Sequence, residues 1–283
     1  MVLTPVAASR TRGVRPASTL LRLADAALTL SDVRLVRDGN VILDGVDWTV
    51  APDERWVLLG ANGSGKTTLM RIASLYLHPS SGTVRVLGEE LGHVDVRSHR
   101  RRIGVVSSSF ADLLRPQLTA RDIVMTAKHA ALEPWWHDYD AADRERALAL
   151  LDRFGCAPLA ERTFATLSSG ERQRVQLART LMADPGLVLL DEAFAGLDLG
   201  GREDLVRRLA ELAADPTTPA TVLVTHHVDE IPAGFTHVLL LKAGRVLARG
   251  PIDDVLTAPT LSDCFDVPLT VERRAGRWWA WQT

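Results

Sequence analysis

Short runs of alternating apolar and polar residues dominate the first part of the chain and predict β-strands. Such runs cover residues 27–39, 41–50, 55–60, 82–88 and 101–107. The first run turns at Asp38-Gly39. After the third run, a glycine-rich loop leads into residues 66–77 (KTTLMRIASLYL), which carry apolar side chains at helical spacing. The chain is therefore predicted to begin with strands, a loop and a helix.

The pattern becomes helical from residue 110 to about residue 166. Residues 118–132 carry apolar side chains at helical spacing behind a threonine cap at Thr119. Residues 140–155 show the same spacing, with Gly155 as the predicted end of the helix. Residues 110–166 are therefore predicted to form a helical insertion in an α/β chain.

Helices and buried strands alternate again after this insertion. Predicted helices cover residues 170–185 and 201–215, and predicted strands cover residues 186–194, 220–227 and 237–250. The strand that ends at Asp191 holds no earlier polar residue, as expected for a parallel strand covered on both faces. The last region contains a hairpin turn at Ala243-Gly244. These patterns predict an α/β fold with a mostly parallel sheet.

The end of the chain, residues 252–283, is predicted to hold a short helix and a hairpin dense in tryptophan. Tryptophan favours interfaces, so this tail could dock on a partner or a membrane face. We favour the alternative, in which the hairpin packs on the preceding domain. The pair Trp135-Trp136 in the helical insertion leaves two interpretations open, a contact with a partner and a core anchor.

Composition narrows the class of protein without identifying it. The 283 residues are 46% hydrophobic and 24% charged, with a net charge of -2, which gives no reason to expect nucleic-acid binding. Two distant cysteines favour a reducing, intracellular setting, and no apolar run approaches the ~20 residues that cross a bilayer. We expect residues 1–25, rich in Arg, Ala, Ser and Thr, to be a disordered leader, although an organelle transit peptide has a similar composition.

Residues 60–67 (GANGSGKT) match the phosphate-loop pattern G-x-x-x-x-G-K-[ST] between a predicted strand and a predicted helix. Glycines let the main chain wrap around phosphates, while N–H groups and the helix N-terminus supply positive potential. Lys66 is expected to reach the β and γ phosphates, and Thr67 to bind Mg²⁺. The predicted ATP contacts are Gly60, Ala61, Asn62, Gly63, Ser64, Gly65, Lys66, Thr67 and Thr68.

Two adjacent carboxylates follow the buried strand of residues 186–194. Asp191 is placed to hold Mg²⁺, and Glu192 to polarise an attacking water. A kinase uses a substrate hydroxyl instead of water, so this pair favours hydrolysis over phosphoryl transfer to a substrate. His226, at the end of another strand, is a candidate sensor of the γ-phosphate, although a histidine there can also be structural.

The sequence LSSGE, residues 167–171, begins a strongly predicted helix. A hydroxyl at a helix N-terminus can bind an anion. The same residues also form an ordinary N-cap, with Glu171 in a capping role. Taken alone, this segment favours the capping interpretation.

The order of these motifs resembles that of the ATP-binding cassette ATPases. The series is GxxxxGKT, LSSGE, the carboxylate pair, AGLD at residues 195–198 and TH at Thr225-His226, and the resemblance covers roughly residues 28–251. It implies a P-loop NTPase core with a mostly parallel sheet, an antiparallel N-terminal β-subdomain and a helical insertion. It also implies that two cassettes pair head to tail around Mg²⁺ and ATP.

By this resemblance, the signature residues Ser168, Ser169, Gly170 and Glu171 would meet the ATP of the other cassette, and Asp198 would connect the two sites. The chain has one phosphate loop and one signature, so it would pair with a second copy or a homologous cassette. The ATPase domain would cover residues 26–251, followed by the tail of residues 252–283.

Three positions depart from the family pattern. The signature is usually LSGGQ, whereas Ser169 and Glu171 replace a glycine and the glutamine here. The aromatic residue that stacks on adenine corresponds to Arg37, whose guanidinium plane could stack on the base instead. At the hinge into the helical insertion the family has a glutamine, whereas this chain has the serine run 107–109, with Ser108 as the nearest match. Ser108 is therefore an added candidate for the Mg²⁺ site.

Two functions remain open at this point. The first is an ATPase that energises a separate membrane-spanning transporter subunit from the cytoplasmic face of the membrane. The second is a soluble cassette ATPase that acts on a protein, a ribosome or a nucleic acid. Transport is favoured on family base rates, and a nucleic-acid partner is the least supported. The serine run and the tryptophan-rich tail also resemble a subgroup associated with molybdate transport or photorepair.

Overall fold

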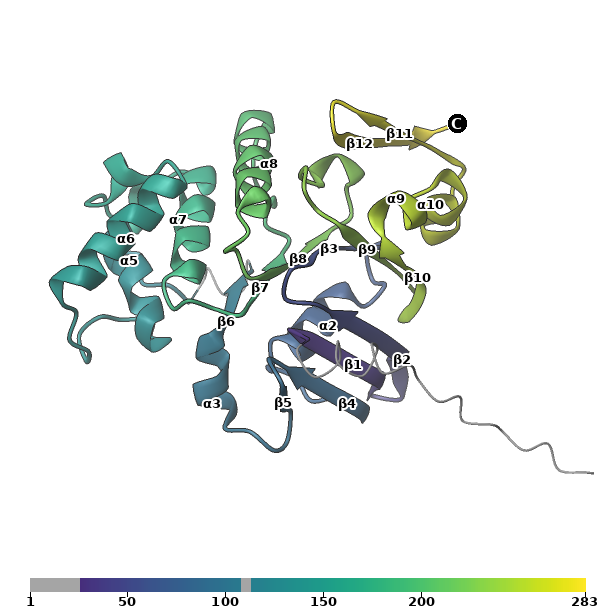
Figure 1. Cartoon of the computed structure of the whole chain (residues 1–283), viewed down its shortest axis with the longest axis horizontal. Helices are drawn as coiled ribbons and strands as arrows, with labels where there is room; N and C mark the ends of the chain where they lie inside the picture. The colour runs from purple at the N-terminus through teal and green to yellow at the C-terminus, as the bar shows by residue number, and fades with distance from the viewer. Residues whose placement is uncertain (1–25, 108–112) are drawn as a thin grey trace, which may run out of the picture.

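The computed structural model describes residues 26–107 and 113–283 (Figure 1). Two sequence-based expectations, the disordered leader at residues 1–25 and the candidate ligand Ser108, lie outside the described residues. Within the described ranges, no helix is both long and apolar enough to cross a bilayer.

The strands of an antiparallel sheet lie on both sides of helix α2 (Lys66–Ala73) in the sequence. Its strand order is β2-β1-β4-β5, with β1 (Leu28–Arg37), β2 (Asn40–Val50), β4 (Ser81–Val86) and β5 (Glu89–Glu90). Asp38 and Gly39 join β1 to β2 with φ of 51° and 79°, the left-handed pair that a two-residue hairpin turn requires. The predicted turn and the antiparallel β-subdomain are both confirmed.

A second, six-stranded sheet has the order β10-β9-β3-β8-β7-β6. Its strands are β3 (Arg55–Leu59), β6 (Ile103–Val106), β7 (Leu187–Asp191), β8 (Ala220–Thr225), β9 (His237–Lys242) and β10 (Arg245–Pro251). The strands from β9 to β6 run parallel, and only β10 returns antiparallel, through a turn at Ala243-Gly244. The predicted mostly parallel sheet is confirmed.

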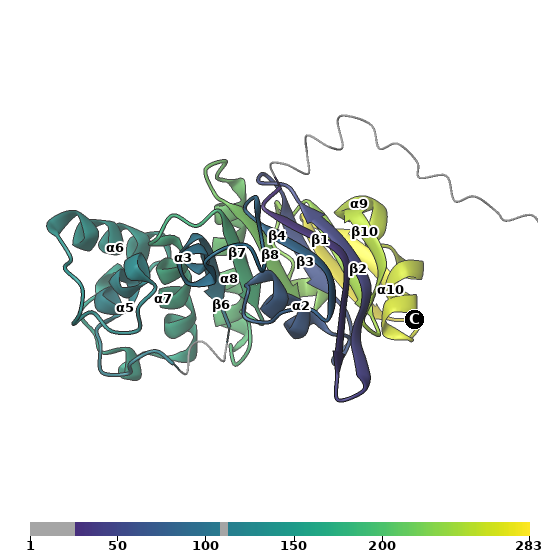
Figure 2. The same cartoon turned by 90° about the horizontal axis from the view of Figure 1, so that it is seen from below.

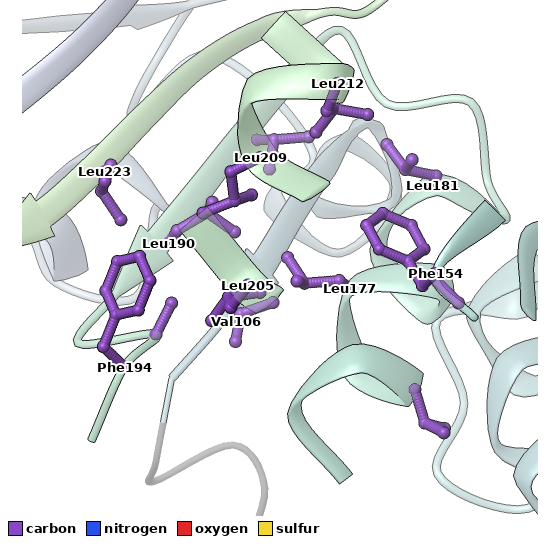
Figure 3. Close-up of a cluster of buried hydrophobic side chains, with 14 of the residues drawn as sticks. Val106, Phe154, Leu177, Leu181, Leu190, Phe194, Leu205, Leu209, Leu212 and Leu223 are labelled. Atoms are coloured by element: carbon purple, nitrogen blue, oxygen red, sulfur yellow. The ribbon is translucent and has the colours of Figure 1, made fainter. Parts of the chain in front are cut away.

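Both faces of this sheet are buried, which explains the unbroken apolar runs of its strands. In β7, Val188 and Leu190 join one hydrophobic cluster, whereas Leu187 and Leu189 join the cluster on the opposite face. The first cluster includes side chains of α7 (Ser169–Leu181) and α8 (Leu199–Ala214), and the second includes α2 (Lys66–Ala73) and the antiparallel sheet. Figure 3 shows part of the first cluster around Leu190. Each such buried side chain contributes about 1.5–3 kcal/mol to the free energy of folding.

Helices α5 (Ala120–Thr126) and α6 (Ala141–Arg153) pack together with α7 at one end of the molecule (Figures 1 and 2). Thr119 caps α5, and Gly155, with φ of 65°, follows the end of α6, so both predicted boundaries are confirmed. Helix α5 is shorter than predicted. Its last turn tightens to a 3₁₀ turn that stops at Ala130, whose φ of 51° cannot continue a helix.

The tail holds two short helices and a hairpin. The helices are α9 (Ile252–Val255) and α10 (Ala258–Phe265), and the hairpin strands are β11 (Leu269–Arg274) and β12 (Arg277–Gln282). A further short helix, α3 (Val96–His99), precedes β6. The single predicted helix is divided because Thr257 caps a new helix with a proline in its first turn. One face of the hairpin packs on the core through Val271 and Trp278.

The tryptophan pair in the helical insertion is exposed. Trp135 is 66% and Trp136 is 84% exposed, so the interpretation of this pair as a core anchor is wrong. Trp279 and Trp281 on the tail hairpin are 40% and 45% exposed, on the face opposite the packed one. The hairpin therefore packs on the domain with only part of its tryptophan surface.

Candidate functional site

The glycine-rich loop lies between β3 and α2, at the carboxyl edge of the six-stranded sheet. A Cβ on Gly60 would lie 2.2 Å from the main-chain oxygen of Leu241, so any side chain there displaces the neighbouring strand. Gly65 has a φ of 105°, and a Cβ on it would lie 2.9 Å from Leu43. The loop is therefore a close-fitting main-chain cradle whose shape depends on these glycines.

Lys66 is the cation of this cradle. Its Nζ donates to the main-chain oxygens of Gly60 at 2.8 Å and Ala61 at 2.9 Å, and the residue is 5% exposed. Burial lowers the pKa of Lys66, while the charges of Glu192 and Asp191 oppose this shift. These acceptors are neutral carbonyl oxygens. Anionic phosphate oxygens would therefore bind the Lys66 ammonium more strongly than the carbonyl oxygens do.

Asp191 ends β7 and is 9% exposed. Burial, followed by the negative charge of Glu192, raises the pKa of Asp191 from 3.8 to about 6, while a hydrogen bond from Thr67 and the charge of Lys66 act in the opposite direction. Its Oδ1 is buried and has no hydrogen-bond partner among residues 26–107 and 113–283. A carboxylate oxygen of this kind beside a threonine hydroxyl is a donor set suited to a hard divalent cation.

The main chain of Glu192 is strained. Its φ is 53°, a left-handed conformation that costs a non-glycine residue about 1–3 kcal/mol and occurs preferentially at functional sites. A cavity of about 470 Å³ lies beside it, with Thr67, Asp191 and Ser107 among its lining residues. The serine run predicted to replace the hinge glutamine therefore reaches this cavity through Ser107.

His226 immediately follows β8 and is exposed. Its ring centroid lies 4.1 Å from that of His227. Although much of the side chain is exposed, its partial burial first and the charge of His227 second lower the pKa of His226, and the charges of Glu192 and Lys66 also act on it. The imidazole is therefore neutral at neutral pH, within electrostatic range of the other two side chains.

Glu230, which was not among the residues predicted from the sequence, organises the loop after β8. Its buried carboxylate accepts a hydrogen bond from the hydroxyl of Thr225, and the N–H of His227 donates to the same hydroxyl at 3.0 Å. The available signal was an acidic residue five positions after Thr225, directly behind Asp229. These bonds fix the main chain on both sides of His226.

The signature residues form a complete capping box at the start of α7. Glu171 N–H donates to Ser168 Oγ at 3.3 Å, and Ser168 N–H donates to the Glu171 carboxylate at 2.7 Å. This hydrogen bond lowers the pKa of Glu171. Ser168 and Ser169 are nevertheless exposed, so the capping role leaves this helix end accessible from outside.

Asp198 and Arg37 lie outside the cavity beside Asp191. Asp198 is exposed and caps α8, where its carboxylate accepts a hydrogen bond from the N–H of Gly201 at 2.7 Å. Arg37 lies exposed at the end of β1, next to the β1–β2 turn. Its proposed contact with adenine stays a prediction.

The strand register explains which candidates come together. Leu59, the last residue of β3, pairs with Thr225 of β8, and Val224 pairs with Asp191 of β7. The phosphate loop, Asp191-Glu192 and His226 therefore leave one edge of the sheet side by side, as ligand-binding loops of parallel sheets do. Among the described residues that line the cavity beside Asp191, none belongs to the signature.

Comparison with known proteins agrees with this arrangement. Residues 43–195 match the family model described as ABC transporter. The chain is 40% identical over 245 residues to the uncharacterized ABC transporter ATP-binding protein YlmA of Bacillus subtilis, covering 86% of this chain and 92% of the relative.

Two solved structures are similar in fold and sequence. One is cbiO1 of Clostridium perfringens, described as part of the ABC transporter complex cbiONQ, with a TM-score of 0.72 and 25% identity over 84% of this chain and 94% of that chain. The other is a dimeric ATP-binding cassette in a post-hydrolysis state with ADP and phosphate, with a TM-score of 0.68 and 26% identity over 80% and 98%.

Proposed function

The chain belongs to the ABC transporter family and is an ATP-binding ATPase, and from this premise we propose that it hydrolyses Mg²⁺-bound ATP as a head-to-tail dimer that energises a separate membrane-spanning subunit. The observation that carries the catalytic part is the group formed by Lys66, Asp191 and Glu192 at one sheet edge.

The phosphate loop, residues 60–68, would wrap the phosphates of ATP through its main-chain N–H groups. Lys66 would exchange its carbonyl acceptors for phosphate oxygens, which are charged and therefore stronger acceptors. At the adenine end, Arg37 would stack on the base through its guanidinium plane.

The Mg²⁺ site would be formed by Thr67 and Asp191. Asp191 Oδ1 has no hydrogen-bond partner among residues 26–107 and 113–283, and this supports the assignment because a buried carboxylate oxygen needs a cation or a donor to offset its lost hydration. When bound, Mg²⁺ supplies positive charge that stabilises the phosphoryl oxygens. Ser108, the added candidate for the Mg²⁺ site, lies outside the described residues and stays a prediction from the sequence.

Glu192 would accept the proton of the attacking water, and neutral His226 would hydrogen-bond the γ-phosphate or that water. The cavity next to Glu192 gives room for the water, and the lowered pKa of His226 leaves a ring nitrogen with a lone pair available. Glu230 would keep His226 in place through the Thr225 hydroxyl.

The second half of each site would come from another cassette. Ser168, Ser169 and Gly170 are exposed or partly exposed at a helix N-terminus, which suits contact with the γ-phosphate of a partner's ATP. Glu171 supports this end by capping it, and Asp198 would connect the two sites. The dimeric cassette with ADP and phosphate supports this pairing.

The transporter role is supported by cbiO1, a relative described as part of a transporter complex. A subunit of this kind acts on the cytoplasmic face of a membrane, bound to its membrane-spanning partner. The other candidate function, action on a protein, ribosome or nucleic acid, predicts that co-purification from the native cell returns such a partner and no membrane protein.

The test of the catalytic part is Glu192→Gln. This variant should bind ATP with wild-type affinity, lose about 10²–10⁴-fold in turnover because the base is removed, and accumulate as an ATP-bound dimer in size-exclusion chromatography. Glu211→Gln, an exposed glutamate on α8, is the matched control and should hydrolyse ATP normally. Wild-type turnover in Glu192→Gln would exclude Glu192 as the base.

A further inference from the structure

The tail hairpin is attached to the domain by two arginines that differ in what they hold. Arg273, on β11, pairs with Asp253 of α9 at 2.8 Å, and its guanidinium lies 5.3 Å from the ring centroid of Trp278. Arg277, on β12, lies 5.5 Å from the ring centroid of Trp279. Each side chain therefore lies near a tryptophan ring of the hairpin, but Arg277 is the more buried of the two and the two have different partners in the domain.

Arg277 bridges two segments of the ATPase domain. One of its terminal nitrogens donates to the carboxylate of Glu203, in the first turns of α8. The other donates to the main-chain oxygen of Asp229, in the 3₁₀ turn Val228–Glu230. Figure 1 shows the hairpin above this part of the domain, with α8 beside it. The planar guanidinium suits such a bridge because its N–H groups point in fixed, separate directions.

The two bridged segments directly follow two loops of the proposed site. Helix α8 starts after Asp198, which caps it, and the 3₁₀ turn starts two residues after His226. A second, longer ion pair joins the same segments, with 3.6 Å between Arg202 Nη1 and Asp229 Oδ2. The main-chain oxygen held by Arg277 belongs to the residue before Glu230, whose carboxylate is bonded to Thr225.

We propose that Arg277 is a positioning residue for ATP hydrolysis: the C-terminal hairpin uses it to hold the His226 loop at a fixed place relative to the start of α8. This inference rests on the function proposed above. It gives the hairpin a role inside the ATPase domain, distinct from docking on a partner. The proposed action of Arg277 runs through the main chain that carries His226, and it needs no direct contact with the nucleotide.

The test compares Arg277→Ala with Arg273→Ala in the full-length protein. Both variants remove one hairpin arginine, one ion pair to the domain and one contact with a tryptophan ring. Arg277→Ala should lower kcat about three- to tenfold with the KM for ATP unchanged, because coupling through such contacts commonly changes a site by these factors. Arg273→Ala should keep wild-type kcat. Equal kcat in the two variants would overturn the inference.

Arg277→Lys separates the bridge from its charge. Lysine keeps the positive charge near Glu203 but loses the rigid fork that reaches two acceptors, so kcat should stay close to that of the alanine variant. Full recovery of kcat by lysine would overturn the bridging role of the guanidinium.

Hydrogen exchange tests the same link without relying on turnover. The N–H groups of Glu230 and Ile231, which close the 3₁₀ turn, should exchange faster in Arg277→Ala than in Arg273→Ala. Unchanged exchange there would overturn the inference whatever the ATPase rates are. Absence of turnover in the wild-type protein would instead count against the proposed ATPase mechanism.

Discussion

The phosphate-loop region and the signature region differ in how their polar groups are satisfied. Around the phosphate loop, Lys66 and Asp191 are buried, with shifted pKa values, and Asp191 Oδ1 lacks a partner within the described ranges. At the signature, Ser168 and Glu171 bond each other in a capping box and lie at the surface. The first region is electrostatically incomplete without a ligand, whereas the second is already stable as a helix end.

A site shared between two chains can therefore be assembled without harming the isolated subunit. The incomplete region is protected within the fold, and the region that must meet a partner is stable when it faces water. If this contrast is correct, each ATP site combines the phosphate loop of one chain with the signature of the other chain. A site can then be disabled by a defect in the phosphate loop of one chain or by a defect in the signature of the other. They should then complement each other when the chains are mixed.

The largest expected effect is recovery of activity in mixed dimers. Lys66→Ala should lose about 10- to 100-fold in ATP affinity, since a charged hydrogen-bond donor to phosphate is removed. Ser169→Glu places a negative charge where the partner's ATP would lie, and each variant alone should be inactive. A one-to-one mixture should regain about one quarter of wild-type turnover, because half of the dimers are mixed and each has one intact site.

The control for this experiment is each variant mixed with itself, which should stay inactive. Size-exclusion chromatography of the mixture with ATP should show dimers. An inactive mixture in which mixed dimers are demonstrated would contradict a site shared between Lys66 of one chain and Ser169 of the other.

The next effect concerns stability in the phosphate-loop region. The folded-state pKa of Asp191 is raised from 3.8 to about 6, so the folded protein retains a proton that the unfolded chain releases between these values. Stability is therefore lost as the pH rises through this range, by at most about 3 kcal/mol. Asp191→Asn should raise the free energy of unfolding at pH 7.5 by about 1–3 kcal/mol and change it little at pH 4.

Urea unfolding at the two pH values measures this difference, while the same variant should lose Mg²⁺-dependent hydrolysis. Asp215→Asn is the control with the opposite sign, because hydrogen bonds from Thr217 lower the pKa of Asp215. An Asp191→Asn variant that is less stable than wild type at pH 7.5 would show that Asp191 is well solvated or paired in the folded protein.

The sequence predicted the parts of the site that depend on local pattern. The glycine spacing, the apolar strand before Asp191 and the threonine cap at Thr119 each follow from interactions within a few residues. The contact of Arg277 with Asp229 joins residues 48 positions apart, and no local pattern encodes it. The course of the hairpin after β11 depends on which face packs on the domain, and tryptophan on both faces left that choice open.

The signature shows a case in which the local pattern supports two roles at once. Sequence alone favoured a capping box at Ser168 and Glu171, and the structure contains it. The family resemblance assigned the same residues to ATP contact. The two roles are compatible because a cap uses the serine oxygen and the N–H groups inside the first turn, while the exposed helix end still presents positive potential.

The smallest expected effect tests whether Glu171 can be exchanged for the family's usual glutamine without loss of the cap. Glutamine can accept the same hydrogen bond from Ser168 N–H, so Glu171→Gln should change the free energy of unfolding at pH 7 by no more than about 0.5 kcal/mol. Ser168→Ala, the reference variant, should cost about 1 kcal/mol because it removes the oxygen that accepts from the Glu171 N–H.

The pH dependence separates charge from capping geometry in this comparison. The hydrogen bond from Ser168 N–H lowers the folded-state pKa of Glu171, so the stabilisation by its charge is present above the ordinary value of 4.5 and is lost as the pH falls through the folded-state value. The small gap between wild type and Glu171→Gln should therefore close in acid, as urea unfolding would measure. A gap that stays constant with pH would mean that the charge of Glu171 adds nothing to the cap, and that the two regions differ in burial alone.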